Sequence, residues 1–298
     1  MDFYGLVQPY KVNRPLCDFE KEERLKPKKC LDVVPHYNLS VIRLNDTFLE
    51  GADKFYPARG FIFLAGFTVF LIMGCMLIYL IGIYLTENIF YSASIGVLLL
   101  LLVSVWLLTR DAFTYTHFPI RFNRKNRQVY VWRRNGTILK AGWDDLYFTI
   151  GGSETTWKDL YVAGHVMDAD GVTVRETFAL GASGEKDQLQ TLWEFYRRYM
   201  EEGPQAVLPA LEKPLICLPR LDLKRETWRF GWERITLQLN GWILLQIVSQ
   251  VFLFPQSLFR WIAMRTSKIP KWPQWVEDEC AVAANDPWVR DVSTNVYL

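Results

Sequence analysis

Few residues of the sequence are spaced to do chemistry together. The three histidines, His36, His117 and His165, are far apart and follow no metal-ligand spacing. Asp144 and Asp145 are adjacent, but neighbouring residues of a strand point to opposite faces, so a turn or capping role is favoured over an acid–base or metal site. The sequence contains no phosphate loop, nucleophile elbow or His-Glu-x-x-His helix. We therefore expect no enzymatic activity, no cofactor and no catalytic or metal site.

Two other features offer only weak chemical signals. The pair Gly151-Gly152, followed by Ser153, has backbone amides that can bind an anion, but a lone glycine pair predicts a loop more often than a binding site. The cysteines are odd in number and scattered, without the spacing of a metal knuckle or redox motif, and this indicates reduced thiols.

One basic cluster is a candidate binding site for lipid or a partner. Its members are Arg124, Lys125, Arg127, Arg133 and Arg134. Near an anionic leaflet, each such charge contributes about 1 kcal/mol of attraction. The simpler interpretation, which we favour, is a cytosolic flank that follows the positive-inside bias of membrane proteins. The net charge of the chain is only +2, so the composition does not favour nucleic acid as a partner.

This cluster follows two long apolar segments that must position it. Residues 61–85 contain no charge, and neither do residues 90–109. Each segment is long enough to cross a bilayer and is apolar on all sides, unlike the amphipathic helix of a soluble core. The break between them is long enough only for a turn. The sequence therefore predicts a transmembrane helical hairpin over residues 59–110, whose two flanks lie on one side of the membrane.

The distribution of basic residues predicts which side that is. Lys54 and Arg59 precede the hairpin, and five basic residues from Arg110 to Arg127 follow it, whereas the turn has none. Because Lys and Arg are enriched in cytoplasmic flanks, we expect a bacterial inner-membrane protein with both termini in the cytosol.

A soluble α+β domain is predicted over residues 115–203. Alternating apolar residues indicate strands, and Asn135-Gly136 predicts a type I′ hairpin turn. An amphipathic helix should follow Ser183, with Trp193, Tyr196 and Tyr199 in the core, and Gly203-Pro204 should end it. Six strands are expected, at residues 120–123, 129–133, 137–140, 147–150, 160–167 and 172–180. About six strands followed by a helix fit a pleckstrin-homology-like barrel or, alternatively, an open α+β sheet.

The two ends of the chain are less regular. Residues 1–58 form a cytosolic arm in this interpretation, with one candidate strand at residues 39–44 that could join a sheet edge. Residues 204–298 form a linker and a membrane-associated helical region. Within it, residues 235–259 lack charge but carry a polar stripe and Pro255, which we expect to break the run. A helix at the membrane surface, or packed on the hairpin, explains this stripe better than a third span does.

The stretches Ile120-Arg121-Phe122-Asn123, Val129-Tyr130-Val131-Trp132 and Trp143-Asp144-Asp145-Leu146, together with the hairpin, resemble a known family. It is an uncharacterised proteobacterial membrane-protein family with a pleckstrin-homology-like domain, often encoded near type VI secretion effectors. The resemblance covers about residues 55–200. It implies an immunity or accessory role by association, and no catalytic residue is carried over.

Two function classes therefore remain open. The first is a non-enzymatic binding protein at the inner membrane, either an immunity protein or an adaptor, whose partner is a secreted effector or a secretion component. The second is a lipid-sensing or envelope-stress module that binds the anionic head groups of membrane lipids.

Overall fold

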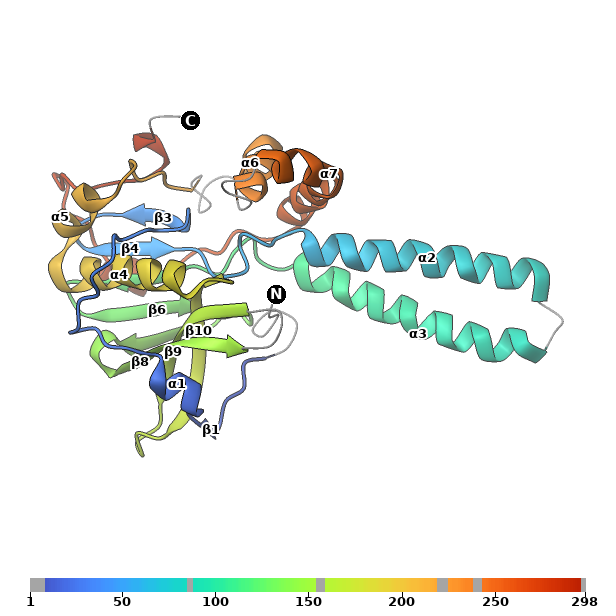
Figure 1. Cartoon of the computed structure of the whole chain (residues 1–298), viewed down its shortest axis with the longest axis horizontal. Coiled ribbons are helices and arrows are strands. Elements are labelled where there is room, and N and C mark those ends of the chain that lie inside the picture. Colours follow the sequence, from blue (N-terminus) through green and yellow to red (C-terminus); the bar gives the residue numbers. More distant parts are fainter. Residues whose placement is uncertain (1–8, 85–87, 154–158, 219–224, 238–242, 296–298) are drawn as a thin grey trace. The chain divides into compact units, whose positions relative to one another are not determined.

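The computed structural model describes residues 9–84, 88–153, 159–218, 225–237 and 243–295. The chain divides into two compact units (Figure 1). The sheet unit comprises residues 1–56, 117–224 and 269–298, and the helical unit comprises residues 57–116 and 225–268. Each unit is thus assembled from stretches that are far apart in the sequence.

The sheet unit contains two five-stranded antiparallel sheets. The first has the strand order β3 (Val41–Leu44), β4 (Phe48–Gly51), β5 (Ile120–Asn123), β6 (Gln128–Trp132) and β7 (Ile138–Gly142). The second has the order β1 (Arg14–Pro15), β10 (Thr173–Ser183), β9 (Asp159–Met167), β8 (Leu146–Ser153) and β2 (Arg24–Leu25). Both sheets curl around one hydrophobic core.

Helix α4 (Lys186–Glu202) closes this core with its aromatic face. Trp193 stacks on Trp143 with ring centroids 5.6 Å apart, and Tyr196 lies 4.9 Å from Phe122. The helix ends at Gly203, whose φ of 92° is a conformation that glycine adopts at little cost. The predicted helix and its buried aromatic face are confirmed.

The six strands predicted between residues 120 and 180 are also present, as β5 to β10. The turn at Asn135-Gly136 differs from the prediction, since only Gly136 has a positive φ. The amide of Gly136 donates to the carbonyl oxygen of Arg133, and the amide of Arg133 donates to the carbonyl oxygen of Thr137. This is a three-residue loop that ends in a left-handed glycine, not a two-residue type I′ turn.

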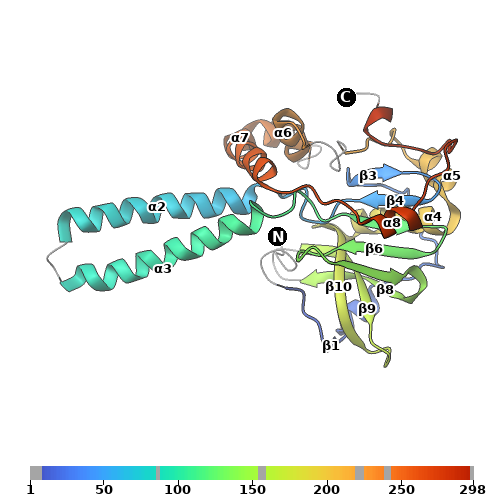
Figure 2. The same ribbon diagram turned by 180° about the vertical axis from the view of Figure 1, so that it is seen from behind.

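Both ends of the chain contribute to the sheet unit, which the division into an arm and a C-terminal helical region did not anticipate. The N-terminal stretch supplies β1 to β4 and helix α1 (Asp18–Glu22), and the expected strand near residues 39–44 is confirmed as β3. The C-terminal stretch supplies α8 (Gln274–Glu279), and its Val276 packs in a cluster with Phe48 and Tyr130 of the first sheet (Figure 2).

The helical unit contains α2 (Phe61–Tyr84), α3 (Asn88–Asp111), α6 (Trp228–Leu237) and α7 (Ile243–Thr266). Helices α2 and α3 form the predicted antiparallel hairpin, with Gly66 of α2 close to Ser104 and Leu107 of α3. Among the described residues, the helices long and apolar enough to cross a membrane are α2, α3 and α7.

The predicted break at Pro255 is wrong, because α7 continues through this residue. A proline inside a helix removes one backbone hydrogen bond. In apolar surroundings, ending the helix would leave several more backbone groups without partners, so continuing it costs less. Of the uncharged run of residues 235–259, residues 235–237 end α6 and residues 243–259 belong to α7, while residues 238–242 lie outside the described part of the chain.

Candidate functional site

The hairpin α2–α3 is inserted between two neighbouring strands of the first sheet. Strand β4 precedes it and β5 follows it, and these strands pair from Phe48 with Asn123 to Gly51 with Ile120. The chain therefore leaves the sheet unit and returns to an adjacent position in it. The two flanks of the hairpin must lie on the same side of any membrane that it crosses.

The outer surface of the hairpin is apolar. Soluble proteins rarely expose contiguous apolar patches larger than a few hundred Å², and a larger surface marks contact with lipid or a partner. The exposed large side chains of the hairpin include Leu71, Ile72, Ile78, Ile81, Ile83, Ile95, Leu98, Leu99, Leu102 and Val103. Acyl chains are the surroundings that suit this surface.

A buried ion pair joins the two helices where the chain enters and leaves the hairpin. Arg59 donates to the carboxylate of Asp111 at 3.1 Å, and both side chains are almost fully buried. The other carboxylate oxygen of Asp111 accepts hydrogen bonds from the amides of Gly60 at 2.8 Å and Phe63 at 3.2 Å. This acidic side chain caps the N-terminus of α2 and fixes it to the end of α3.

The predicted basic cluster lies in the sheet unit, in two turns. Arg124, Lys125 and Arg127 are in the turn between β5 and β6. Arg124 and Lys125 both pair with Asp46, at 2.5 Å and 3.3 Å.

Arg127 is held more firmly than the other members of this turn. Its guanidinium binds the carboxylate of Asp144 through two hydrogen bonds of 2.5 and 2.6 Å, and it donates to Glu201 at 2.8 Å. The hydrogen bond from Arg127 holds the pKa of Asp144 below its usual range. Burial alone would raise the pKa of Glu201, but hydrogen bonds from Lys28, Arg127 and Trp143 lower it.

The remaining two arginines lie at the turn between β6 and β7. Arg133 forms a bidentate ion pair with Glu176 of β10, with a shortest distance of 2.5 Å, and Arg134 is inside the turn. Arg124, Lys125, Arg127 and Arg133 thus have a carboxylate partner within their own unit. The structure does not bring all five together at one surface.

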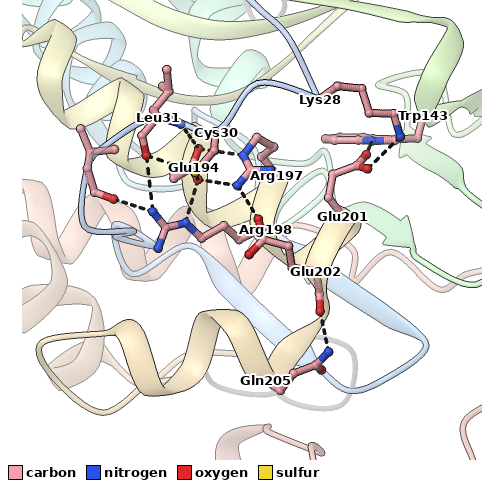
Figure 3. Close-up of polar contacts among 11 residues, drawn as sticks. Lys28, Cys30, Leu31, Trp143, Glu194, Arg197, Arg198, Glu201, Glu202 and Gln205 are labelled. Carbon is pink, nitrogen blue, oxygen red and sulfur yellow. Dashed lines mark hydrogen bonds and ion pairs between the residues drawn. The ribbon is translucent and has the colours of Figure 1, made fainter.

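The N-terminal stretch is fixed to α4 by a second network of charges (Figure 3). The carboxylate of Glu194, which is buried, accepts hydrogen bonds from the amide of Leu31 at 3.2 Å, from Arg197 at 2.8 Å and from Arg198 at 2.7 Å. Glu201, further along the helix, binds Lys28. Residues 28–33 are therefore part of the domain and not a free arm.

A buried ion pair links β4, β5 and α8. Arg121, which is 0% exposed, donates to Glu50 at 2.8 Å and to Glu277 of α8 at 3.1 Å. Arg43 also binds Glu50, at 3.1 Å. Burial alone would raise the pKa of Glu50, but the charges of Arg121 and Arg43 outweigh it and lower this pKa to about 2.

A cavity of about 260 Å³ lies between the β3–β4 hairpin and the C-terminal stretch. Its apolar lining includes Leu44, Phe48, Val282 and Val289, and its polar lining includes Arg43, Asn45, Glu277, Arg290 and Asp291. The wall is therefore apolar with charges of both signs. Such a lining suits side chains of a protein or peptide better than a purely apolar ligand.

Sequence analysis did not identify the residues of this cavity. Arg43 gave one signal, since alternation places it on the same face as the apolar Leu39 and Val41 of the candidate strand. Glu277 and Arg290 gave none, because they lie in a stretch that was assigned to the membrane region. In the described part of the chain, no group of three His, Cys, Asp or Glu residues is arranged to hold a metal ion.

Comparison with known proteins identifies a family. The model of a family of unknown function (DUF6708) matches residues 97–284, which is more than half of the chain. No curated protein and no solved structure matches the sequence.

Proposed function

We propose that this chain, which belongs to the family of unknown function DUF6708, is a non-enzymatic binding protein of the bacterial inner membrane. In this proposal it is an immunity or accessory protein linked to type VI secretion, and it binds an effector at the membrane. The observation that carries the proposal is the insertion of the apolar hairpin between β4 and β5. Strands β4 and β5 join the binding domain directly to the hairpin. In this proposal the hairpin holds the domain at the membrane surface and raises its effective concentration there.

The sheet unit is the proposed binding module, with the pleckstrin-homology-like fold expected from the sequence. Strands β5 to β10 followed by α4 support this fold by their number and order. The resemblance to a family often encoded near type VI secretion effectors supports an effector as the partner. Both termini are cytosolic in this proposal, as the basic flanks of the hairpin indicate.

The cavity beside β3 is the proposed contact site for the effector. At about 260 Å³ it is slightly smaller than typical small-molecule pockets, which span roughly 300–1,000 Å³, and its size suits a few side chains. At its rim, Val282 is 39% exposed. Its apolar wall can receive an anchoring side chain, while the charges of both signs around it can pair with polar neighbours of that anchor.

Site-specific photocross-linking in the native host tests this site. A photoreactive phenylalanine analogue replaces Val282 at the cavity in one variant and Val172, which is 56% exposed in the β9–β10 turn, in a matched control. We expect position 282, but not 172, to cross-link a type VI secretion effector of the native host. We also expect the chain to protect cells that express this effector. The proposal is abandoned if the chain neither protects nor cross-links to it.

The lipid-sensing alternative is less well supported, because carboxylates of the sheet unit pair with Arg124, Lys125, Arg127 and Arg133. Lys125 is the member of the turn with the weakest pairing. Hydrogen exchange of residues 124–134 in nanodiscs separates the two functions. Protection that appears only with anionic lipid, and is lost in Lys125→Glu, would favour lipid sensing over effector binding.

A further inference from the structure

We propose that α6 and α7 form a helical hairpin that lies in the interfacial region of one leaflet, with both of its ends on the same side, so that α7 is not a third transmembrane span. The exposed face of α7 is then covered by lipid acyl chains. This inference rests on the hairpin α2–α3 as the membrane anchor and does not depend on which partner the sheet unit binds.

The first argument comes from the residues on either side of the α6–α7 segment, which is the part of the helical unit from residue 225 to 268. Cys217 precedes this segment and Asn295 follows it. The amide of Cys217 donates to the side chain of Asn295 at 2.8 Å, and the side-chain amide of Asn295 donates to the carbonyl of Cys217 at 2.7 Å. These two residues belong to one folded unit, so they lie on the same side of the membrane. A single crossing by α7 would separate them.

A second crossing by α6 cannot restore this arrangement. This helix has 10 residues, which corresponds to about 15 Å at 1.5 Å per residue. The hydrocarbon core of a bilayer is about 30 Å thick. Helix α6 also carries Arg229, Glu233 and Arg234, which are costly inside that core.

The polar stripe of α7 packs against α6. The indole nitrogen of Trp228 donates to Ser257 at 2.9 Å, and that of Trp232 donates to Gln250 at 2.7 Å. Phe254 lies edge-on to Trp228, with ring centroids 5.8 Å apart. Some of the polar side chains that argued against a membrane span in the sequence therefore have hydrogen-bond partners within the α6–α7 hairpin.

The opposite face of α7 is apolar and exposed. Its residues recur at helical spacing, at positions 244, 247, 248, 251 and 252. All five side chains are large and exposed, namely Leu244, Ile247, Val248, Val251 and Phe252. One polar face and one apolar face are the pattern of a helix in the plane of a membrane surface, whereas α2 and α3 are apolar on all sides.

The last turns of α7 are attached to the beginning of α2. Arg260 is fully buried, pairs with Glu226 at 2.5 Å and donates to the carbonyl of Pro57 at 3.2 Å. Phe259 contacts Phe63 and Phe67, with ring centroids 5.4 and 5.0 Å apart. Both views show α7 beside the first turns of α2 (Figures 1 and 2). This attachment places the base of the second hairpin where the first one enters the membrane.

Thiol labelling of the full-length protein in spheroplasts tests the topology. Leu244→Cys introduces a thiol near the start of α7, and Tyr84→Cys, at the end of α2, is the positive control. A membrane-impermeant maleimide added from outside should label the control but not position 244. Labelling of both positions to the same extent would show that α7 crosses the membrane and would overturn the proposal.

The depth of α7 gives an independent measurement. Cys17, Cys30 and Cys75, which are exposed, are replaced by Ser, and bimane is attached to Val251→Cys in vesicles that carry nitroxide lipids. Because Val251 is 72% exposed, we expect quenching, and a shallow nitroxide should quench more than one near the bilayer centre. Stronger quenching by the deep nitroxide would indicate a span. No quenching by either nitroxide would indicate that protein covers this face, for example a second copy, and both results refute the proposal.

Discussion

The ion pair between Glu50 and Arg121 leads to a quantitative prediction for Glu50→Gln. Arg121 is fully buried, and the substitution leaves its charge without its buried partner. Breaking a buried pair from one side costs about 3–5 kcal/mol. The pKa of Glu50 gives a similar magnitude for the stabilisation. Its decrease from 4.5 to about 2 in the folded protein corresponds to about 3 kcal/mol, at about 1.4 kcal/mol per pH unit.

Hydrogen exchange of the full-length protein in detergent micelles measures this cost. A loss of about 3 kcal/mol increases the exchange of β4 and β5 on the order of 100-fold, since each 1.4 kcal/mol is a factor of about 10. Glu277→Gln is the matched control. Glu277 binds the same arginine but its side chain is 41% exposed, so its loss should cost less than about 1 kcal/mol.

The pH dependence has a defined sign. The pKa of Glu50 is lower in the folded state than in the unfolded state, so its charge stabilises the fold above about pH 4.5. This stabilisation decreases between pH 4.5 and about pH 2, where the folded carboxylate becomes protonated. The difference between wild type and Glu50→Gln should therefore narrow as the pH decreases through this range. The reasoning is refuted if Glu50→Gln accelerates exchange no more than Glu277→Gln does at pH 7.

Three further predictions concern packing. In Gly51→Ala the new Cβ would overlap the hydroxyl group of Tyr196, which should destabilise the fold by about 1–3 kcal/mol. Calorimetry should therefore show a lower melting temperature for Gly51→Ala, and adding Tyr196→Phe should restore part of it. Maleimide labelling at pH 8, followed by mass spectrometry, should modify the exposed Cys17 quickly; Cys217 should react only after unfolding, because burial raises its pKa to about 12, and its rapid labelling in the folded protein would contradict the structure. Gly60→Ala combines a φ of 86° with an overlap on the backbone of Arg260, near the end of α7, so it should increase proteolysis just after α7, and an unchanged cleavage pattern would contradict this contact.

The parts of the fold that could be predicted from the sequence have local signals. Uncharged runs of 25 and 20 residues predict a hairpin of two helices long enough to cross a membrane, and the alternation in residues 129–133 predicts β6. The spacing of Trp193, Tyr196 and Tyr199 identifies α4 in the same way. These signals depend on a few consecutive residues and on the solvent that each face meets.

The remaining elements depend on partners that are distant in sequence. Strand β4 is only four residues long and includes Glu50, a pattern that does not predict a strand. Its charge becomes compatible with burial only because Arg121, 71 residues later, binds it. The same holds for the basic turn, since the sequence shows the charge of Arg124 but not that Asp46 neutralises it. Composition and spacing cannot identify such pairs.

The division of the sheet unit into three stretches has a consequence for how the protein is made. Synthesis proceeds from the N-terminus, so β4 exists before the two spans that separate it from β5. The free edge of β3 is covered last, when Leu44 exchanges backbone hydrogen bonds with Arg290. Until then the nascent chain presents an unpaired strand, and exposed strand edges are a known route to misassembly.

The cavity beside β3 is lined by residues from both ends of the chain, from Arg43 to Asp291. It therefore forms only after both parts of the helical unit have been synthesised. A truncated chain that ended before α8 would keep its hairpin α2–α3 but would lack the far wall of the cavity. Under the proposed function, only molecules whose helices α2, α3, α6 and α7 have already been synthesised can hold a partner there.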